Sequence, residues 1–195
     1  MATAQATAEL TRVVDGEIVP AAGTYTLDKA HTVIAFVARH LMVTKVRGTF
    51  GEFEGTVVVA EDPAASSVEA TIRTDSVSTG EAQRDAHLRS GDFFEQDKYP
   101  TMRFASTAVR PRGDGKWQVI GDLTIKDVTR SLPLELEFNG ATPDPWGGVR
   151  LGFSAATEID RTEFGVSWNS ALDGGGVVVG NRVRIEIEAE AVLAS

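Results

Sequence analysis

The 195-residue sequence contains no cysteine, which excludes disulfides, cysteine-ligated zinc, iron–sulfur clusters and a thiol nucleophile. Positive charge is also scarce, because 19 Lys and Arg residues face 28 Asp and Glu residues and leave a net charge of −9. Nucleic-acid binding and adsorption to an anionic bilayer both need a basic surface. The overall charge therefore argues against nucleic acid and against an anionic bilayer as partners.

Long hydrophobic runs are missing as well. No stretch approaches the roughly 20 apolar residues that a membrane span requires, so no transmembrane segment is expected. Residues 1–22 are rich in Ala and Thr, then acidic at Glu9, Asp15 and Glu17. They lack the basic and apolar regions of a signal peptide, and we therefore expect a cytoplasmic protein. The hydrophobic content of 42% is enough for one core, and the length suits a single domain.

Apolar and polar residues alternate with period two from Thr24 onward, as in half-buried strands. The clearest run is 183–193, where Arg184, Glu186, Glu188 and Glu190 separate apolar residues. Strands are predicted at 24–30, 33–41, 46–60, 68–73, 101–110, 117–126, 132–138, 149–155 and 183–193. The three glycines of 46–60 indicate that this run bends or splits into a hairpin.

These strands and the turns between them predict an all-β fold of roughly eight strands, as an up-and-down barrel or a sandwich. Residues 80–91 break the pattern, because they are rich in helix formers and hold no β-branched residue, and they predict one short helix. We expect an N-terminal arm over 1–22 and one β-barrel domain over 23–195. No second domain is visible.

Three histidines are the first candidates for chemistry. His31, His40 and His87 show no i, i+2 or i, i+4 pairing, so no metal site is predicted. His40 shares a strand face with Phe36, and Arg39 on the other face is a poor interior residue. We therefore expect His40 to point inward, either with a structural hydrogen bond or in contact with the polar end of a ligand.

Other catalytic motifs are absent. The sequence has neither G-x-S-x-G nor Ser-x-x-Lys, and the glycine run 174–176 precedes a strand, which indicates a loop and not a phosphate cradle. Residues 160–165 are interpreted as a turn with a buried Phe. The charged cluster Arg84, Asp85, His87 and Arg89 suits either a solvated helix face or an anionic head group. No catalytic residue, metal or cofactor is predicted.

The apolar interior is the remaining candidate site. A barrel of about eight strands holds either packed side chains or one ligand. Gly121 lies mid-row between bulky residues of 117–125, which leaves room for another group, although close strand packing or a bend would also explain it. Burial of a long apolar ligand would gain roughly 0.8 kcal/mol per methylene. The expected ligand-binding residues are Phe36, His40, Phe104, Val119, Gly121, Leu123, Leu134, Leu136, Phe138, Leu151 and Phe153.

A series of short motifs runs along the chain: Tyr25-Thr-Leu-Asp-Lys-Ala-His31, Phe36-Val-Ala-Arg-His40, Val46-Arg-Gly-Thr-Phe50, Thr79-Gly80, Arg84-Asp-Ala-His-Leu-Arg-Ser-Gly-Asp-Phe93, Tyr99-Pro100, Gly121-Asp-Leu-Thr-Ile125, Asp127-Val-Thr129, Asp144-Pro-Trp-Gly-Gly148 and Asp160-Arg-Thr-Glu-Phe-Gly165. By these motifs the chain resembles the YceI-like family of polyisoprenoid-binding, lipocalin-like proteins. The resemblance covers about residues 23–193, with the motifs in the family's order.

This resemblance implies an eight-stranded antiparallel lipocalin-like barrel with one short helix around an apolar tunnel. It implies binding, storage or transport of a long apolar lipid: a polyisoprenoid, prenyl phosphate or isoprenoid quinone, or a fatty-acid derivative. Many members are periplasmic, and no catalytic role transfers. Motif matches make five residues candidates for head-group contacts: Asp28, His31, Arg84, His87 and Arg89.

A second function stays open from the sequence. An enzyme acting on a bound isoprenoid could use His40 with Asp28 or Asp85 as acid and base, provided that they converge inside the cavity. A continuous apolar tube favours the carrier instead. The sequence also leaves open whether the chain forms a homodimer.

Overall fold

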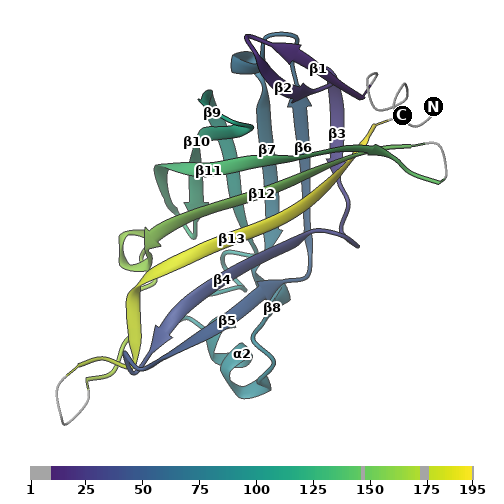
Figure 1. Cartoon of the computed structure of the whole chain (residues 1–195). Helices are drawn as coiled ribbons and strands as arrows, with labels where there is room; N and C mark the ends of the chain where they lie inside the picture. The colour runs from purple at the N-terminus through teal and green to yellow at the C-terminus, as the bar shows by residue number, and fades with distance from the viewer. Residues whose placement is uncertain (1–9, 146–147, 172–175, 195) are drawn as a thin grey trace.

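A computed structural model describes residues 10–145, 148–171 and 176–194. These residues form an antiparallel β-barrel with a short helix, α2 (Ala82–Arg89), which confirms the predicted fold class (Figure 1). The strands are β1 (Thr11–Val14), β2 (Glu17–Pro20), β3 (Gly23–Leu27), β4 (Val33–His40), β5 (Thr44–Phe50), β6 (Phe53–Val59), β7 (Ser67–Arg73), β8 (Val77–Ser78), β9 (Thr101–Gly113), β10 (Lys116–Ile125), β11 (Val128–Pro143), β12 (Val149–Asp160) and β13 (Val179–Leu193), with 3-10 helices η1 (Pro63–Ala65), η2 (Thr74–Ser76) and η3 (Arg161–Phe164).

Eight strands close the barrel in the order β12, β11, β10, β9, β7, β6, β3 and β13, and β13 pairs back with β12. The long β13 also pairs with β4, so β3 and β4 behave as two halves of one strand. In the same way β6 pairs with β3, and β5 pairs with β4. The run 46–60 therefore bends at residues 51–52 and does not form a hairpin. The bend is held by backbone bonds to Arg73 and Ser76.

Alternation places the apolar side chains inside, as β10 illustrates. Trp117, Val119, Leu123 and Ile125 are buried, whereas Asp122 on the opposite face is exposed. The predicted inward face of this strand is confirmed. A main core cluster fills much of the barrel, and a smaller cluster of Tyr25, Val59, Leu151 and Ala191 packs separately.

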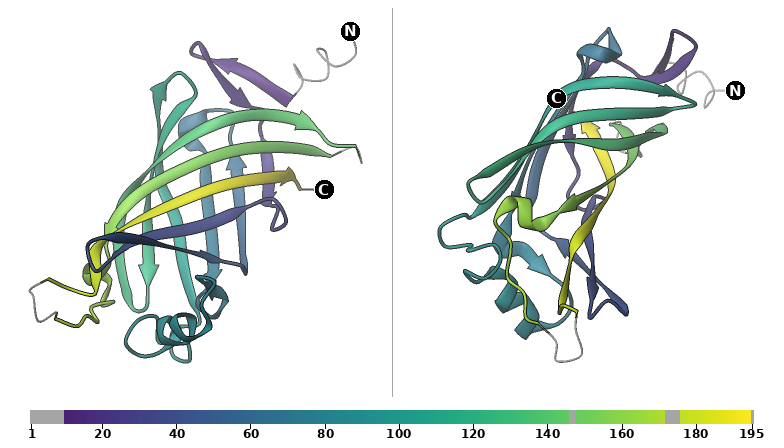
Figure 2. Two further views of the ribbon diagram at one scale, coloured as in Figure 1. Left: turned by 60° about the horizontal axis from the view of Figure 1, so that its bottom comes forward. Right: turned by 90° about the vertical axis from the view of Figure 1, so that its left-hand side faces the viewer.

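The helix α2 lies within the predicted range 80–91. The Glu81 carboxylate accepts hydrogen bonds from the backbone N–H groups of Gln83 (3.0 Å) and Arg84 (2.6 Å), which satisfies two free donors of the first turn. Leu88 packs against the main core. Figures 1 and 2 show α2 at the end of the barrel near β5 and β8, opposite β1 and β2.

Residues 11–20 of the predicted arm form the β1–β2 hairpin, whereas residues 1–9 lie outside the described chain. Arg12 donates hydrogen bonds to the backbone carbonyls of Ala60 and Glu61, and the Glu17 carboxylate accepts one from Gly115 N at 3.1 Å. Val19 is buried. We call this end of the barrel, with the β1–β2 hairpin and the Tyr25 cluster, the arm end. The opposite end, with α2, η3 and the β4–β5 turn, is called the helix end.

Candidate functional site: an apolar cavity with one buried arginine

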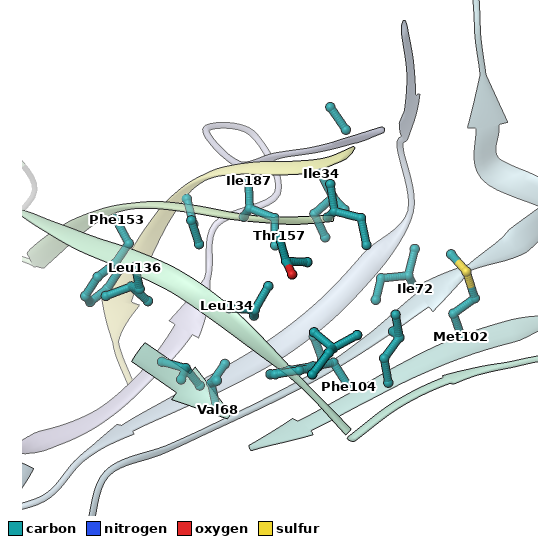
Figure 3. Close-up of a pocket in the computed structure, with 18 of the residues that line it drawn as sticks. Ile34, Val68, Ile72, Met102, Phe104, Leu134, Leu136, Phe153, Thr157 and Ile187 are labelled. Atoms are coloured by element: carbon teal, nitrogen blue, oxygen red, sulfur yellow. The ribbon is translucent and has the colours of Figure 1, made fainter. Parts of the chain in front are cut away.

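A cavity of about 310 Å³ lies inside the barrel, walled by residues from β2 to β13. Its lining is almost entirely aliphatic and aromatic, as the side chains in Figure 3 show. Cavities of this size and character are typical sites for apolar small molecules. Contact with a ligand stays a prediction for the eight expected residues that line the cavity: Phe36, Phe104, Val119, Leu123, Leu134, Leu136, Phe138 and Phe153.

Few polar side chains reach the cavity. Ser66 and Ser67 line it together with Val19 and Pro20, which belong to the arm end, and Thr157 extends from β12. In Figure 3 the Thr157 hydroxyl lies among carbon atoms of the surrounding strands. Arg161 continues the inward face of β12 beyond Thr157 and is the charged residue of the described lining.

Arg161 is 5% exposed and binds four backbone carbonyls. Its Nε donates to Gly180 O (3.1 Å), Nη1 to Val166 O (2.6 Å) and Trp168 O (2.9 Å), and Nη2 to Val179 O (3.3 Å). Burial lowers the pKa of Arg161, and the nearby Asp160 carboxylate opposes that shift. No carboxylate of the described residues lies within ion-pair distance of the guanidinium. Arg161 therefore places a buried positive charge at the border of an apolar cavity, without an ionic partner among the described residues.

His40 does not occupy the position that we expected. It is exposed at the end of β4, opposite Thr44 and Val179, and it does not line the cavity. Alternation assigned the correct face to Phe36, which does line the cavity. It could not show that β4 extends beyond the end of the cavity, and this extension places His40 in solvent.

Gly121 and Leu151 are also buried without lining the cavity. A Cβ on Gly121 would lie 2.3 Å from Phe104 Cζ and 2.7 Å from the carbonyl oxygen of Ala105. The Phe104 ring therefore fills the space that we assigned to a ligand. Leu151 faces inward but packs in the Tyr25 cluster at the arm end. Both corrections arise because a neighbouring strand supplies the atoms, which the pattern of a single strand does not reveal.

Three of the expected head-group residues lie on α2 and serve local structure. Arg84 donates to the Thr79 hydroxyl (2.7 Å), and Arg89 donates to the backbone carbonyls of Asp75 and Val77. His87 bonds Asp92 at 2.7 Å, and its ring lies edge-on to Phe93 and Trp168. None of the three lines the cavity. They attach α2 to the segments beside it.

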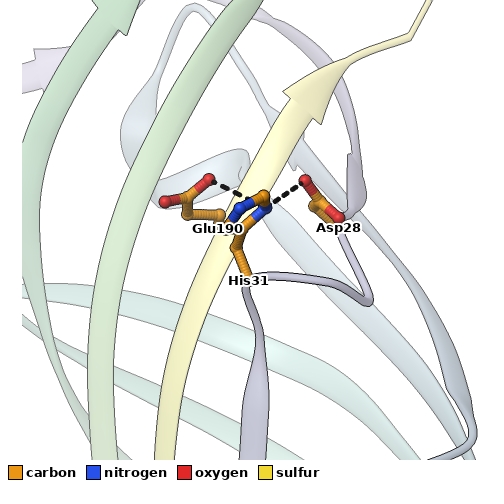
Figure 4. Close-up of side chains that lie close together, drawn as sticks. All are labelled: Asp28, His31 and Glu190. Atoms are coloured by element: carbon orange, nitrogen blue, oxygen red, sulfur yellow. Dashed lines mark hydrogen bonds and ion pairs between the residues drawn. The ribbon is translucent and has the colours of Figure 1, made fainter.

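The other two head-group candidates, Asp28 and His31, lie outside the barrel. His31 Nδ1 is 2.8 Å from Asp28 Oδ2 and 3.8 Å from Glu190 Oε2 (Figure 4). Arg150 pairs with both carboxylates, and its hydrogen bond, followed by that of His31, holds the pKa of Asp28 well below its usual range. The potential ligand atoms of Asp28, His31 and Glu190 all lie within 4.8 Å of one another, a spacing that would suit a metal ion. The Arg150 guanidinium already supplies the positive charge, so this is a salt-bridge network that joins β3, β12 and β13.

The acid–base pair of the alternative enzyme is not assembled. His40 is exposed at the helix end, Asp28 belongs to the Arg150 network, and Asp85 accepts hydrogen bonds from the backbone N–H and the hydroxyl of Thr79. None of the three lines the cavity. The geometry therefore gives no support to His40 as the acid or base of a reaction inside the barrel.

Arg161 is the residue that the sequence interpretation missed. The turn with a buried Phe was correct, since Phe164, the last residue of η3, is buried. A usable signal was present, because Arg161 continues the inward positions 157 and 159 of β12. We interpreted the arginine as part of a turn with a buried Phe, and only the fold shows that the carbonyls of Val166, Trp168, Val179 and Gly180 surround it.

Comparisons with known proteins agree with this architecture. A family model described as a YceI-like domain matches residues 25–191. Protein YceI of Shigella flexneri is 43% identical over 148 residues, which cover 74% of this chain and 77% of that protein.

Two solved structures show the same fold. BcnA of Burkholderia cenocepacia has a TM-score of 0.74 at 24% identity and covers 84% of this chain and 98% of its own. A polyisoprenoid binding domain from Saccharophagus degradans has a TM-score of 0.65 at 15% identity and covers 87% of this chain and 98% of its own. No helix in the described residues has the length and apolarity to cross a membrane. From the family model and the Shigella relative together, the chain belongs to the YceI-like family.

Proposed function

We propose that this protein binds and carries a long apolar lipid of the isoprenoid class inside its barrel. The observation that supports this most is the continuous apolar wall of the cavity, which favours a hydrocarbon chain over a polar metabolite. The structural similarity to a polyisoprenoid binding domain from Saccharophagus degradans points in the same direction.

We further propose that the polar end of the lipid lies at Arg161. A guanidinium has five N–H donors, and the four carbonyl contacts of Arg161 leave one donor for a ligand. Its buried charge also has no carboxylate partner among the described residues, and burial of an unpaired charge is costly. A prenyl phosphate would supply the missing anion, and a quinone oxygen would supply only an acceptor. The charge therefore favours the phosphate.

Two measurements test the lipid class. Native mass spectrometry of the purified protein should show a bound long-chain lipid, identified in the organic extract. Delipidated protein is then titrated with a prenyl phosphate, an isoprenoid quinone and a prenyl hydrocarbon of equal chain length. A forty-carbon chain at about 0.3 kcal/mol per heavy atom gives an upper limit of about 12 kcal/mol, or nanomolar affinity. Failure to bind any of the three below roughly millimolar concentration contradicts the proposal.

Substitutions test the position of the polar end. In Arg161→Gln the preference for phosphate over hydrocarbon should fall about tenfold or more, because charge-assisted hydrogen bonds contribute about 1.5–3 kcal/mol. Arg161→Lys should retain part of the preference. Loss of the carbonyl contacts will also lower stability, so the measured quantity is the affinity ratio within each folded variant. Thr157→Val is the control in the same cavity. An unchanged ratio in Arg161→Gln would place the polar end elsewhere.

A further inference from the structure

The β4–β5 hairpin tip, residues 39–47, differs from the rest of this acidic chain. It reads RHLMVTKVR and contains three basic residues, one histidine and no acidic residue, whereas the whole chain has a net charge of −9. Its apex is apolar and exposed: Leu41 is 38%, Met42 53% and Val43 74% accessible. Three consecutive exposed apolar side chains at the apex of a hairpin, flanked by charged residues, are typical of an interaction site.

The backbone of this apex is strained. Leu41 and Met42 have φ values of 52° and 61°, and Val43 N donates to His40 O at 3.1 Å. A turn with two consecutive positive φ angles is the type I′ turn, which strongly favours Asn-Gly. Leu and Met disfavour this conformation, so the turn carries a conformational cost. In this conformation the large apolar side chains of Leu41 and Met42 are exposed at the end of the hairpin.

The flank of the apex is unusually basic. Arg39 lies directly opposite Lys45 across the β4–β5 pair, and directly opposed like charges are destabilising. In the part of the chain that the structure describes, neither side chain has a carboxylate within ion-pair distance. Arg47 is paired with Glu186. Two unpaired cations therefore lie side by side next to an apolar apex, and together they create a local positive field that an external anion would relieve.

We propose that the β4–β5 hairpin tip docks on an anionic membrane surface. The apolar apex enters the boundary between head groups and acyl chains, while Arg39 and Lys45 contact anionic head groups. The overall negative charge opposes adsorption of the whole molecule, so the hairpin tip is the surface that faces the bilayer. A soluble polyanion would satisfy the cations but would leave the apex in water, which is why a bilayer is the better partner.

The hairpin tip lies next to the end of the cavity that Arg161 borders. Gly180 connects the two sites, because its carbonyl accepts from Arg161 Nε and a Cβ added to it would lie 3.3 Å from Arg39 Cβ. The tip is therefore adjacent to the arginine end of the cavity. A docked tip would bring this end of the cavity to the bilayer, where a lipid could enter or leave. That step rests on the proposed function, whereas docking of the tip does not.

Vesicle co-sedimentation tests the docking with the full-length protein. Binding to vesicles of phosphatidylcholine with added phosphatidylglycerol should exceed binding to pure phosphatidylcholine, and it should weaken as salt rises. Arg39→Gln and Lys45→Gln should each weaken binding about fivefold. The double change Leu41→Asn with Met42→Gly should abolish it. This pair suits a type I′ turn, so thermal stability should stay constant or rise, which separates loss of docking from loss of folding.

Several outcomes would overturn the proposal. Equal binding to both vesicle types, or to neither, contradicts an anionic bilayer as partner. Retention of binding by the Leu41→Asn, Met42→Gly protein would remove the apex from the contact. DNA or heparin that binds as well as anionic vesicles, with no effect of the apex change, would assign the cations to a soluble polyanion. None of these outcomes affects the lipid titration, so failure here is distinct from failure of the proposed carrier function.

Discussion

The two ends of this barrel are built in opposite ways. At the arm end, Tyr25, Val59, Leu151 and Ala191 form a packed cluster, and the β1–β2 hairpin is bonded across it through Arg12 and Glu17. At the helix end, Leu88, Phe93 and Phe94 close the core beside a buried arginine, and the neighbouring hairpin exposes apolar side chains. The comparison indicates that the arm end secures the fold, and our two proposals place the polar end of the ligand and the docking surface at the helix end.

The largest expected effect comes from a matched pair of leucines. Leu151→Ala removes a side chain that is 0% exposed within the arm-end cluster and should cost about 3–5 kcal/mol of unfolding free energy. Leu134→Ala, at 8% exposure, borders the cavity and should cost about 2–3 kcal/mol, because part of its surface already faces open space. Denaturant titration of both variants measures the difference.

For the affinity of a bound lipid, the order of the two leucine substitutions should be reversed. Leu134→Ala should weaken binding of a prenyl lipid about tenfold through lost apolar contact, and Leu151→Ala should leave the affinity of the folded protein unchanged. Equal losses of stability, or a loss of affinity confined to Leu151→Ala, would show that the packed and hollow parts of the barrel have been assigned wrongly.

A smaller effect is expected from the network that joins β3 to β12 near the arm end. Asp28→Asn should cost about 1–3 kcal/mol, because Arg150 and His31 lose a charged acceptor that is 18% exposed. The folded-state pKa of Asp28 is depressed, so its contribution is present above the unfolded value near 4 and is lost as pH falls below it. Wild type and variant should therefore converge in stability toward low pH.

The exposed Lys29–Glu52 pair provides the control for this measurement. Its side chains are 55% and 64% accessible, so Glu52→Gln should change stability by no more than about 1 kcal/mol. A constant difference between wild type and Asp28→Asn across the acidic range would mean that the carboxylate does not act through its ionised form.

Much of the fold was predictable from local pattern, since alternation identified inward faces and helix formers identified α2. The local pattern could not show which inward side chains border the cavity and which pack against a neighbouring strand. Gly121 was assigned to the cavity, but the Phe104 ring from β9 fills that space. Leu151 has the predicted orientation, yet it lies beyond the cavity in another cluster. Whether an inward side chain meets ligand or neighbour depends on strand register and tilt, which the sequence of one strand does not contain.

The roles of the polar residues were harder to predict, because they depend on which backbone and side-chain groups the fold places beside them. Arg84, His87 and Arg89 looked like a head-group cluster on a helix face, but each bonds a nearby loop or side chain. Arg161 looked like a turn residue, but the carbonyls of Val166, Trp168, Val179 and Gly180 surround it. Composition also concealed a local property, since a net charge of −9 says nothing of the basic segment 39–47.

The smallest effect is expected at the outer surface of the arm end, where Val13 and Ile18 are paired and 71% and 60% exposed. This apolar pair resembles the apex of the β4–β5 tip in exposure but not in charge. Its flank holds the acidic Asp15 and Glu17, and Arg12 is bonded to backbone carbonyls. Ile18→Gln should therefore change stability by less than about 0.5 kcal/mol and leave binding to phosphatidylglycerol vesicles at the wild-type level. Loss of vesicle binding in Ile18→Gln equal to that of the Leu41→Asn, Met42→Gly protein would mean that both ends meet the bilayer, and that apolar exposure without basic flanks is sufficient for docking.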